Sequence, residues 1–176
     1  MISKIAYTGL LWEDAQGQRV RQVIDGSNED SISRRRVLDP LVRPLRIVET
    51  YVELEDGTKV SFKFDEIARI IPDRTGVLVI FEPGSYTHPD GTDVFPAPNN
   101  AAIYNADGSL RFQLRIPLGH IVDRIAAIHG GAIVSPKFKD MMGVLIATDK
   151  RGPPEYVYVI DPSQPELIST GQWVRW

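Results

Sequence analysis

One loop of the sequence gathers the residue types that acid–base or metal chemistry needs. The segment 82–99 contains His88, Asp90 and Asp93 within six residues, so it offers one imidazole and two carboxylates. Its Asp-Gly-Thr-Asp run lacks the spacing and the terminal glutamate of an EF-hand calcium loop. Asp-Gly is also a common turn dipeptide, and the chain uses it elsewhere at turns. We therefore expect no metal site and no cofactor, while a small enzyme with its site in this loop stays an alternative.

Other catalytic patterns are missing from the sequence. It contains no Gly-x-Ser-x-Gly elbow, no phosphate-binding P-loop and no dinucleotide fingerprint. It contains no cysteine, which excludes disulfides, thiolate zinc ligands and cysteine nucleophiles. The three histidines, His88, His120 and His129, have no neighbours in sequence that mark a catalytic triad. The sequence therefore predicts a protein that is not an enzyme.

The charge balance argues against nucleic acid as a partner. The net charge is −3, although one basic strip interrupts the acidic chain. The strip comprises Arg34, Arg35, Arg36, Arg43 and Arg46. Phosphate contacts dominate the affinity of proteins for nucleic acid, so an acidic chain with a single strip is a poor binder. Because Pro40 and Pro44 cannot donate to a ladder, we expect an irregular or edge segment that its charge keeps from pairing.

The remaining chemistry is recognition of another protein. Glu49, Glu53 and Glu55 form an acidic ladder that would complement a basic partner, with a solvated sheet face as the alternative. Trp176 at the end of the chain is of a residue type enriched at interface hot spots. For Trp173 we favour a core-facing position on a last strand. The predicted partner-binding residues are thus Glu49, Glu53, Glu55 and Trp176.

Two Asp-Gly hairpins define the expected fold. In the segment 47–64 the loop 55–57 fixes a register that puts apolar residues on one face and charged residues on the other. The predicted pairs are Leu54 with Thr58, Val52 with Val60, Thr50 with Phe62, Tyr51 with Ser61, Glu53 with Lys59 and Glu49 with Lys63. In the segment 100–116 the loop 106–108 likewise places Asn105 opposite Ser109, with Gly108 in the left-handed region.

The other segments complete a β-rich chain. Strands are expected at 2–12, 19–24, 76–81, 132–135, 143–148, 156–160 and 167–173, with a loop at 25–33. Short helices are expected at 65–71 and, with a strand as the alternative, at 118–128, where Gly130-Gly131 would end the helix. The predicted fold class is all-β, or β-rich with one or two short helices. The hairpins would form an antiparallel meander arranged as a sandwich, a curled sheet or a partial propeller.

We expect a single domain over residues 1–176, with two blade-like pseudo-repeats at about 76–116 and 143–174. A Gly-Val-Leu run begins the matched part of each repeat, at Gly76 and Gly143. No run of about 18 apolar residues exists, so no membrane span is expected. The N-terminus lacks a secretory signal, which favours a cytoplasmic protein.

Two stretches carry a resemblance to a known class of proteins. They are IYNADGSLRFQLRIP at 103–117 and GVLIATDKRGPPEYVYVIDPSQPELISTG at 143–171. They resemble small β-rich bacterial immunity proteins of polymorphic or contact-dependent inhibition toxin systems. The resemblance implies a stoichiometric inhibitor that binds a cognate toxin domain, and it carries over no binding residues. If the toxin is a nuclease, the acidic ladder would occupy the surface meant for phosphates.

The predicted function is therefore a non-enzymatic binding protein of the bacterial cytoplasm, namely an immunity protein that binds and neutralises a toxin domain. Two alternatives remain: a small enzyme using His88, and a structural subunit that self-associates through a sheet edge. The sequence leaves the oligomeric state open.

Overall fold

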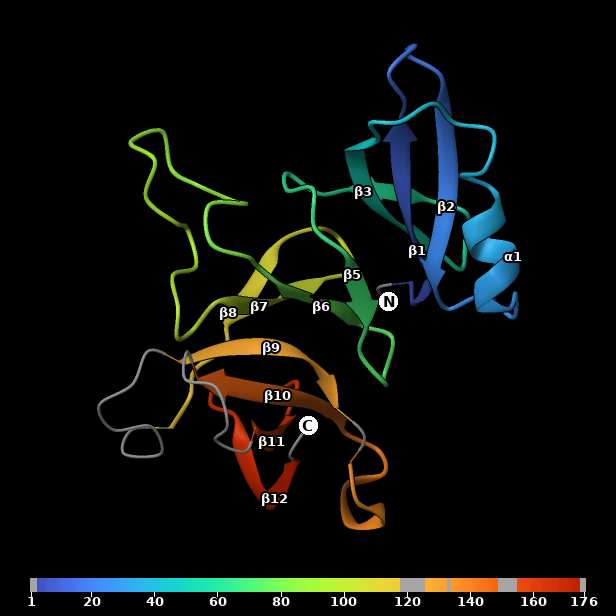
Figure 1. Cartoon of the computed structure of the whole chain (residues 1–176). Coiled ribbons are helices and arrows are strands. Elements are labelled where there is room, and N and C mark those ends of the chain that lie inside the picture. Colours follow the sequence, from blue (N-terminus) through green and yellow to red (C-terminus); the bar gives the residue numbers. More distant parts are fainter. Residues whose placement is uncertain (1–2, 118–125, 133, 149–154, 175–176) are drawn as a thin grey trace. The chain divides into compact units, whose positions relative to one another are not determined.

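The protein is built from antiparallel β-sheets. The computed structural model describes residues 3–117, 126–132, 134–148 and 155–174. These residues form three four-stranded sheets with the strand orders β2-β1-β3-β4, β5-β6-β7-β8 and β12-β11-β10-β9 (Figure 1). One α-helix and one 3-10 helix, Pro136–Phe138, accompany them in the described part of the chain. The predicted all-β class with a short helix is confirmed.

The chain forms two compact units. One comprises Met1–Val79 with Tyr104–Ser109, and the other comprises Ile80–Ile103 with Leu110–Trp176. The expectation of one domain with two pseudo-repeats stays a prediction.

The first sheet lies in the first unit and consists of β2 (Arg19–Asp25), β1 (Ile5–Glu13), β3 (Arg46–Leu54) and β4 (Lys59–Ser61). The β3–β4 hairpin has the predicted register. Val52 pairs with Val60, Glu53 with Lys59 and Tyr51 with Ser61. Gly57 takes φ +83°, as the turn requires, and its N–H donates to Leu54 O at 2.9 Å. The period-two pattern of buried and charged residues therefore selects this register.

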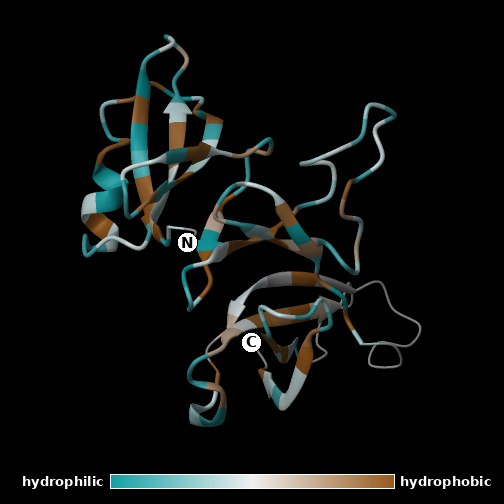
Figure 2. Ribbon diagram, turned by 180° about the vertical axis from the view of Figure 1, so that it is seen from behind, coloured by the Kyte–Doolittle hydropathy of each residue, from teal (hydrophilic) through white to brown (hydrophobic). Residues whose placement is uncertain are grey.

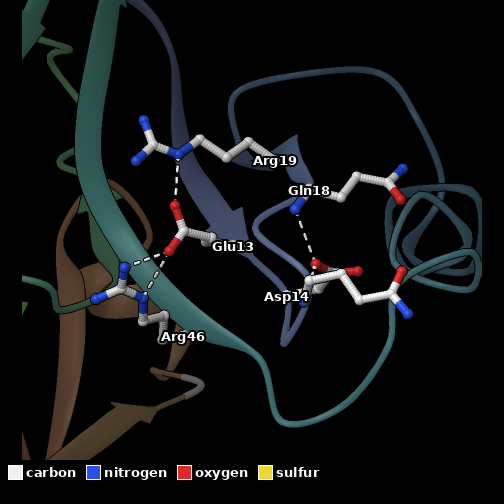
Figure 3. A network of polar contacts seen from close by, with 6 residues as sticks. Glu13, Asp14, Gln18, Arg19 and Arg46 are labelled. Atoms are coloured by element: carbon white, nitrogen blue, oxygen red, sulfur yellow. Dashed lines mark hydrogen bonds and ion pairs between the residues drawn. The ribbon is translucent and has the colours of Figure 1, made fainter.

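The turn between β1 and β2 is held by two carboxylates (Figure 3). Asp14 is buried, and its oxygens accept the N–H groups of Gln16, Gln18 and Val42 at 2.8–3.0 Å. The bond from Val42, followed by the others, lowers the pKa of Asp14. Glu13 pairs with the guanidinium groups of Arg19 and Arg46. Arg46, at the start of β3, is thus engaged within its own sheet.

The helix α1 (Ser31–Arg36) was not predicted from the sequence. The expected loop at 25–33 and irregular or edge segment at 34–46 are wrong where this helix forms. Asp30 is its N-cap, with Oδ1 accepting the N–H groups of Ile32 and Ser33 at 2.9 Å each. Such a cap satisfies backbone donors that are otherwise unpaired at a helix start. Pro40 and Pro44 lie after the helix and therefore do not interrupt it.

The second sheet consists of β5 (Ala68–Ile70), β6 (Gly76–Ile80), β7 (Ala101–Asn105) and β8 (Leu110–Gln113). The predicted helix at 65–71 is wrong, because Ala68 and Ile70 alternate with exposed Arg69 and pair with β6. The β7–β8 turn is as predicted. Asn105 N–H donates to Ser109 O at 2.8 Å, and Gly108 takes φ +85°.

The last sheet consists of β9 (Ala126–Ala132), β10 (Met142–Thr148), β11 (Glu155–Ile160) and β12 (Ile168–Val174). Gly130 and Gly131 pair with β10, so their predicted role as a helix stop is wrong. Residues 118–125 of the predicted helix lie outside the described residues. The side chain of buried Asn100 donates to the carbonyls of Phe81 and Ile128 at 3.0 Å each and accepts the Ile128 N–H at 2.7 Å. A buried amide with three bonds holds β9 in place within the second unit.

Candidate functional site

One face of the first sheet carries two of the predicted binding residues. Successive side chains of a strand point to opposite faces, so Glu49, Tyr51 and Glu53 of β3 share a face while Thr50 and Val52 face the core. The pairing brings further residues of β1, β2 and β4 to the same face. The same pairings place the half-buried Leu11 and Val23 on this face as well. We call the other residues of the face the polar face: Tyr7, Gly9, Arg21, Glu49, Tyr51, Glu53, Lys59 and Ser61.

Tyr51 is the buried centre of the polar face. It is 2% exposed, and it lies against Gly9, where an added Cβ would come within 2.5 Å of the phenol ring and hydroxyl. The Arg21 Cζ lies 5.9 Å and the Lys59 Nζ 5.1 Å from the ring centroid. Tyr7 meets the same ring edge-on, at 6.4 Å between centroids. Cations over an aromatic face are attracted by its quadrupole, so the Tyr51 ring stabilises Arg21 and Lys59 in the positions where they cover it.

The two carboxylates of the polar face are held by hydrogen bonds within the sheet. Lys59 Nζ lies 2.8 Å from Oε1 and 3.0 Å from Oε2 of Glu49, and the Ser61 hydroxyl donates to the same carboxylate. Partial burial raises the pKa of Glu49, but the bonds from Lys59 and Ser61 outweigh it and lower the pKa. The predicted pairing of Glu49 with Lys63 is replaced by this diagonal contact with Lys59.

Glu53 instead accepts a hydrogen bond from the Tyr7 hydroxyl. This bond, followed by burial, raises the pKa of Tyr7 to about 12. Burial also raises the pKa of Tyr51. Both phenols therefore stay protonated near neutral pH, where they offer hydrogen-bond donors and aromatic surface rather than a base.

The structure brings together only part of the predicted binding set. Glu49 and Glu53 share the polar face, and Arg21 and Lys59 balance their two charges. Glu55 lies in the exposed β3–β4 turn, where its N–H donates to Lys4 O at 2.9 Å. Trp176 lies outside the described residues. The ladder is therefore a charge-balanced patch beside an acidic turn, and the binding role of these four residues stays a prediction.

The central position of Tyr51 was missed from the sequence. The available signal was Gly9, since a glycine inside a strand often marks the close approach of another group.

A second exposed cluster lies on the last sheet. Tyr156 of β11 pairs with Trp173 of β12, and they are 44% and 56% exposed. The expectation that Trp173 faces the core is wrong. The signal was the composition of the strand, because Ser169 and Gly171, four and two positions before Trp173, are polar or small and are exposed like it. The strand β12 is at the edge of its sheet, so the aromatic pair is next to an unpaired strand edge in the described sheet order.

The loop 82–99 uses its carboxylates to hold turns. Asp90 Oδ1 accepts the Thr92 N–H at 3.0 Å and the Thr92 hydroxyl at 2.6 Å, and Asp93 Oδ1 accepts the Gly84 N–H at 2.8 Å. The side chain of His88 is exposed, and its backbone N–H donates to Thr92 O at 2.8 Å. Within the described residues, no three Asp, Glu, His or Cys side chains form a group that would hold a metal ion. The side chain of His129 and the whole of His120 lie outside the described part of the chain.

Comparison with known proteins gives a fold and no family. No family model and no curated protein matches the chain. A chain in the solved structure of Tne2 in complex with Tni2 is similar at a TM-score of 0.55 and 14% identity. The match covers 94% of this chain and 96% of that chain. It shows that the two chains share a fold over almost their whole lengths. In the described part of this chain, no helix is long and apolar enough to cross a membrane.

Proposed function

We propose that this protein is a non-enzymatic immunity protein of the bacterial cytoplasm that binds and neutralises a cognate toxin domain. The observation that carries the proposal is the shared fold with a chain whose solved structure is a complex of two proteins, Tne2 and Tni2. The resemblance of residues 103–117 and 143–171 to immunity proteins supports the same reading from the sequence. The first part of the proposal is that this chain binds another protein, and the second part is that the bound protein is toxic.

The polar face and the adjacent turn form the proposed binding surface. In the free protein, Lys59 holds the carboxylate of Glu49 and Tyr7 holds that of Glu53. A side chain that is already ordered loses less entropy on binding. Glu55 is exposed in the turn that joins β3 to β4. Basic groups of a toxin domain would meet Glu55 directly and compete with Lys59 for Glu49.

The test begins with affinity purification of the full-length tagged chain from its native lysate and identification of the proteins that it retains. Each retained protein is expressed alone in a bacterial host, and growth is followed with and without this chain. The proposal predicts one retained protein that arrests growth and is neutralised by co-expression. If the retained proteins are harmless alone, or arrest growth equally with this chain present, the immunity role is wrong.

The surface is tested by charge reversal in the same growth assay. The triple variant Glu49→Lys, Glu53→Lys, Glu55→Lys is expected to lose protection, whereas Asp65→Lys, Glu82→Lys, Asp140→Lys carries the same charge change at exposed positions elsewhere. Protection by the first variant would exclude this surface while leaving the immunity role intact. The single variant Glu55→Lys controls for misfolding of the triple variant, because the Glu55 side chain is exposed in a turn and its replacement does not disturb the packing of the sheet.

Self-association is a second candidate, favoured by the exposed Tyr156–Trp173 pair on the edge strand β12. Edge strands and exposed aromatic residues both favour association with another chain. Light scattering of the wild type and of Trp173→Ser distinguishes the cases. A concentration-dependent dimer that Trp173→Ser dissociates supports this candidate, and a monomer at all concentrations excludes it.

A further inference from the structure

The segment that begins with α1 has two sides with different surroundings. Its inner side is anchored to the sheet of the first unit. Gln22 Nε2 donates to Arg34 O at 3.0 Å, the Arg34 guanidinium donates to Ile24 O, and Leu41 is buried. Further along, Val42 N–H donates to Asp14 Oδ2 at 3.0 Å. These contacts hold the segment 31–43 against β2 and the β1–β2 turn.

The outer side combines apolar and cationic side chains that are open to solvent. Residues 32, 35 and 36 share one helix face because residues three and four apart are neighbours on a helix. No residue of α1 is buried. We call the exposed set the α1 surface: Ile32, Arg35, Arg36, Val37, Val42 and Arg43. Figure 2 shows apolar and hydrophilic residues next to one another along α1.

The apolar members of the α1 surface are strongly exposed. Ile32 is 61%, Val42 44% and Val37 37% exposed, so three of the seven large exposed apolar residues in the described chain lie within this segment. Single exposed apolar residues are ordinary on a surface, so these three carry the argument only together with the unpaired cations of the same segment.

The cationic members are not neutralised by the protein itself. Within the described residues, Arg35, Arg36 and Arg43 have no side-chain hydrogen bond or ion pair, in contrast with Arg19 and Arg46, which share Glu13. The segment 31–46 holds five arginines, one aspartate and no lysine, although the whole chain has a net charge of −3. A guanidinium is weakly hydrated and binds carboxylates through two parallel bonds, which makes arginine suited to protein interfaces.

We propose that the α1 surface binds an acidic protein segment in which Asp or Glu alternates with apolar side chains. Charge complementarity selects carboxylates for Arg35, Arg36 and Arg43, and the apolar positions of the partner cover Ile32, Val37 and Val42. Nucleic acid is the other polyanion that these arginines would attract, but a phosphate backbone leaves the three aliphatic side chains exposed. This surface is separate from the polar face, and the inference does not depend on the toxin-neutralising role.

The test is a selection from a random 16-residue peptide library displayed on phage, with the full-length protein as the bait. We expect the selected peptides to be enriched in Asp and Glu with interleaved apolar residues. Fluorescence anisotropy then gives the Kd of one selected peptide for each variant and at two salt concentrations. We expect Arg35→Glu, Arg36→Glu, Arg43→Glu to raise the Kd by about ten-fold or more, Ile32→Ser to raise it by about three-fold or more, and added salt to weaken binding.

The matched control is Lys4→Glu, Lys63→Glu, Lys139→Glu, which makes the same charge change at exposed positions outside the segment. Circular dichroism confirms that each variant is folded. The inference is overturned if no peptide binds above background, if the peptides are neutral or basic, or if the control weakens binding as much as the arginine variant. Tighter binding of a 20-base-pair DNA duplex at the same salt concentration would instead assign the surface to nucleic acid.

Discussion

The polar face and the α1 surface belong to the same unit and both carry cationic side chains, yet these cations differ in whether the protein itself pairs them. On the polar face, Lys59 is paired with Glu49 and packs with Arg21 over the ring of Tyr51. On the α1 surface, Arg35 and Arg36 extend from a helix without buried residues. A charge that is satisfied internally has to exchange one hydrogen-bond partner for another when a protein binds, whereas an unsatisfied one is available directly. The number of charges in a segment therefore does not by itself locate an interface.

The largest expected effect breaks the packing of the polar face. Gly9→Ala places a Cβ within 2.5 Å of the Tyr51 ring, which is 2% exposed and covered by Arg21, Lys59 and Tyr7. The ring has to move, so we expect a loss of about 1–3 kcal/mol in the free energy of unfolding. Urea denaturation followed by tryptophan fluorescence measures it.

The control for this variant is Gly130→Ala. Gly130 also lies in a strand, but no atom lies within 4 Å of an added Cβ there. We expect a change of no more than about 0.5 kcal/mol. Equal losses in the two variants would show that strand glycine, rather than the contact with Tyr51, determines the cost.

The contrast between these glycines shows what local sequence patterns reveal. The Asp-Gly turns at Gly57 and Gly108 were predicted because the glycine and its flanking residues specify the turn locally. The contact between Gly9 and Tyr51 depends on the pairing of β1 with β3, whose residues are about forty positions apart in the chain. Long-range pairing leaves no local pattern, so Glu49 and Glu53 were placed on one face without the tyrosine between them being recognised as its centre.

Two elements were mistaken for local reasons. The helix at 65–71 was expected from a cap at Asp65 and a stop before Pro72, but the short strand β5 alternates about Arg69 and is selected by pairing with β6. For α1, the cap at Asp30 was present in the sequence, but the prolines that follow diverted the interpretation toward an irregular segment. The exposed position of Trp173 was missed because its residue type was given more weight than its polar or small neighbours on the strand.

A second prediction separates the phenols of the polar face by pH. The pKa of Tyr7 is raised from 10.0 to about 12 in the folded protein, chiefly by the hydrogen bond to Glu53. A raised pKa means that the stabilisation is complete below pH 10 and is lost as the pH rises from 10 through 12. We therefore expect the wild type to lose stability steeply in this range and Tyr7→Phe to lose less.

The measurement is urea denaturation at several pH values, with phenolate absorbance recorded in parallel. Burial raises the pKa of Tyr51 and Tyr158 as well, so several tyrosines titrate late in the wild type, and one of them should disappear from the absorbance curve when Tyr7 is replaced by Phe. A wild-type curve in which all tyrosines ionise together near pH 10 would contradict the hydrogen bond to Glu53.

The smallest expected effect is the difference between a paired and an unpaired cation in their contributions to the free energy of unfolding. A double-mutant cycle with Glu49→Gln and Lys59→Met isolates the interaction of these two side chains, for which we expect about 0.2–1 kcal/mol because both are partly exposed.

Arg35→Met removes a cation that has no partner within the described residues, so the free energy of unfolding should stay within about 0.5 kcal/mol of the wild type. Acid sharpens the difference, since the lowered pKa of Glu49 means that its stabilisation is present above the ordinary value of 4.5 and is lost as the pH falls below it. The coupling of Glu49 with Lys59 should therefore vanish at low pH, and a coupling that persists there would mean that packing, not charge, joins the two side chains.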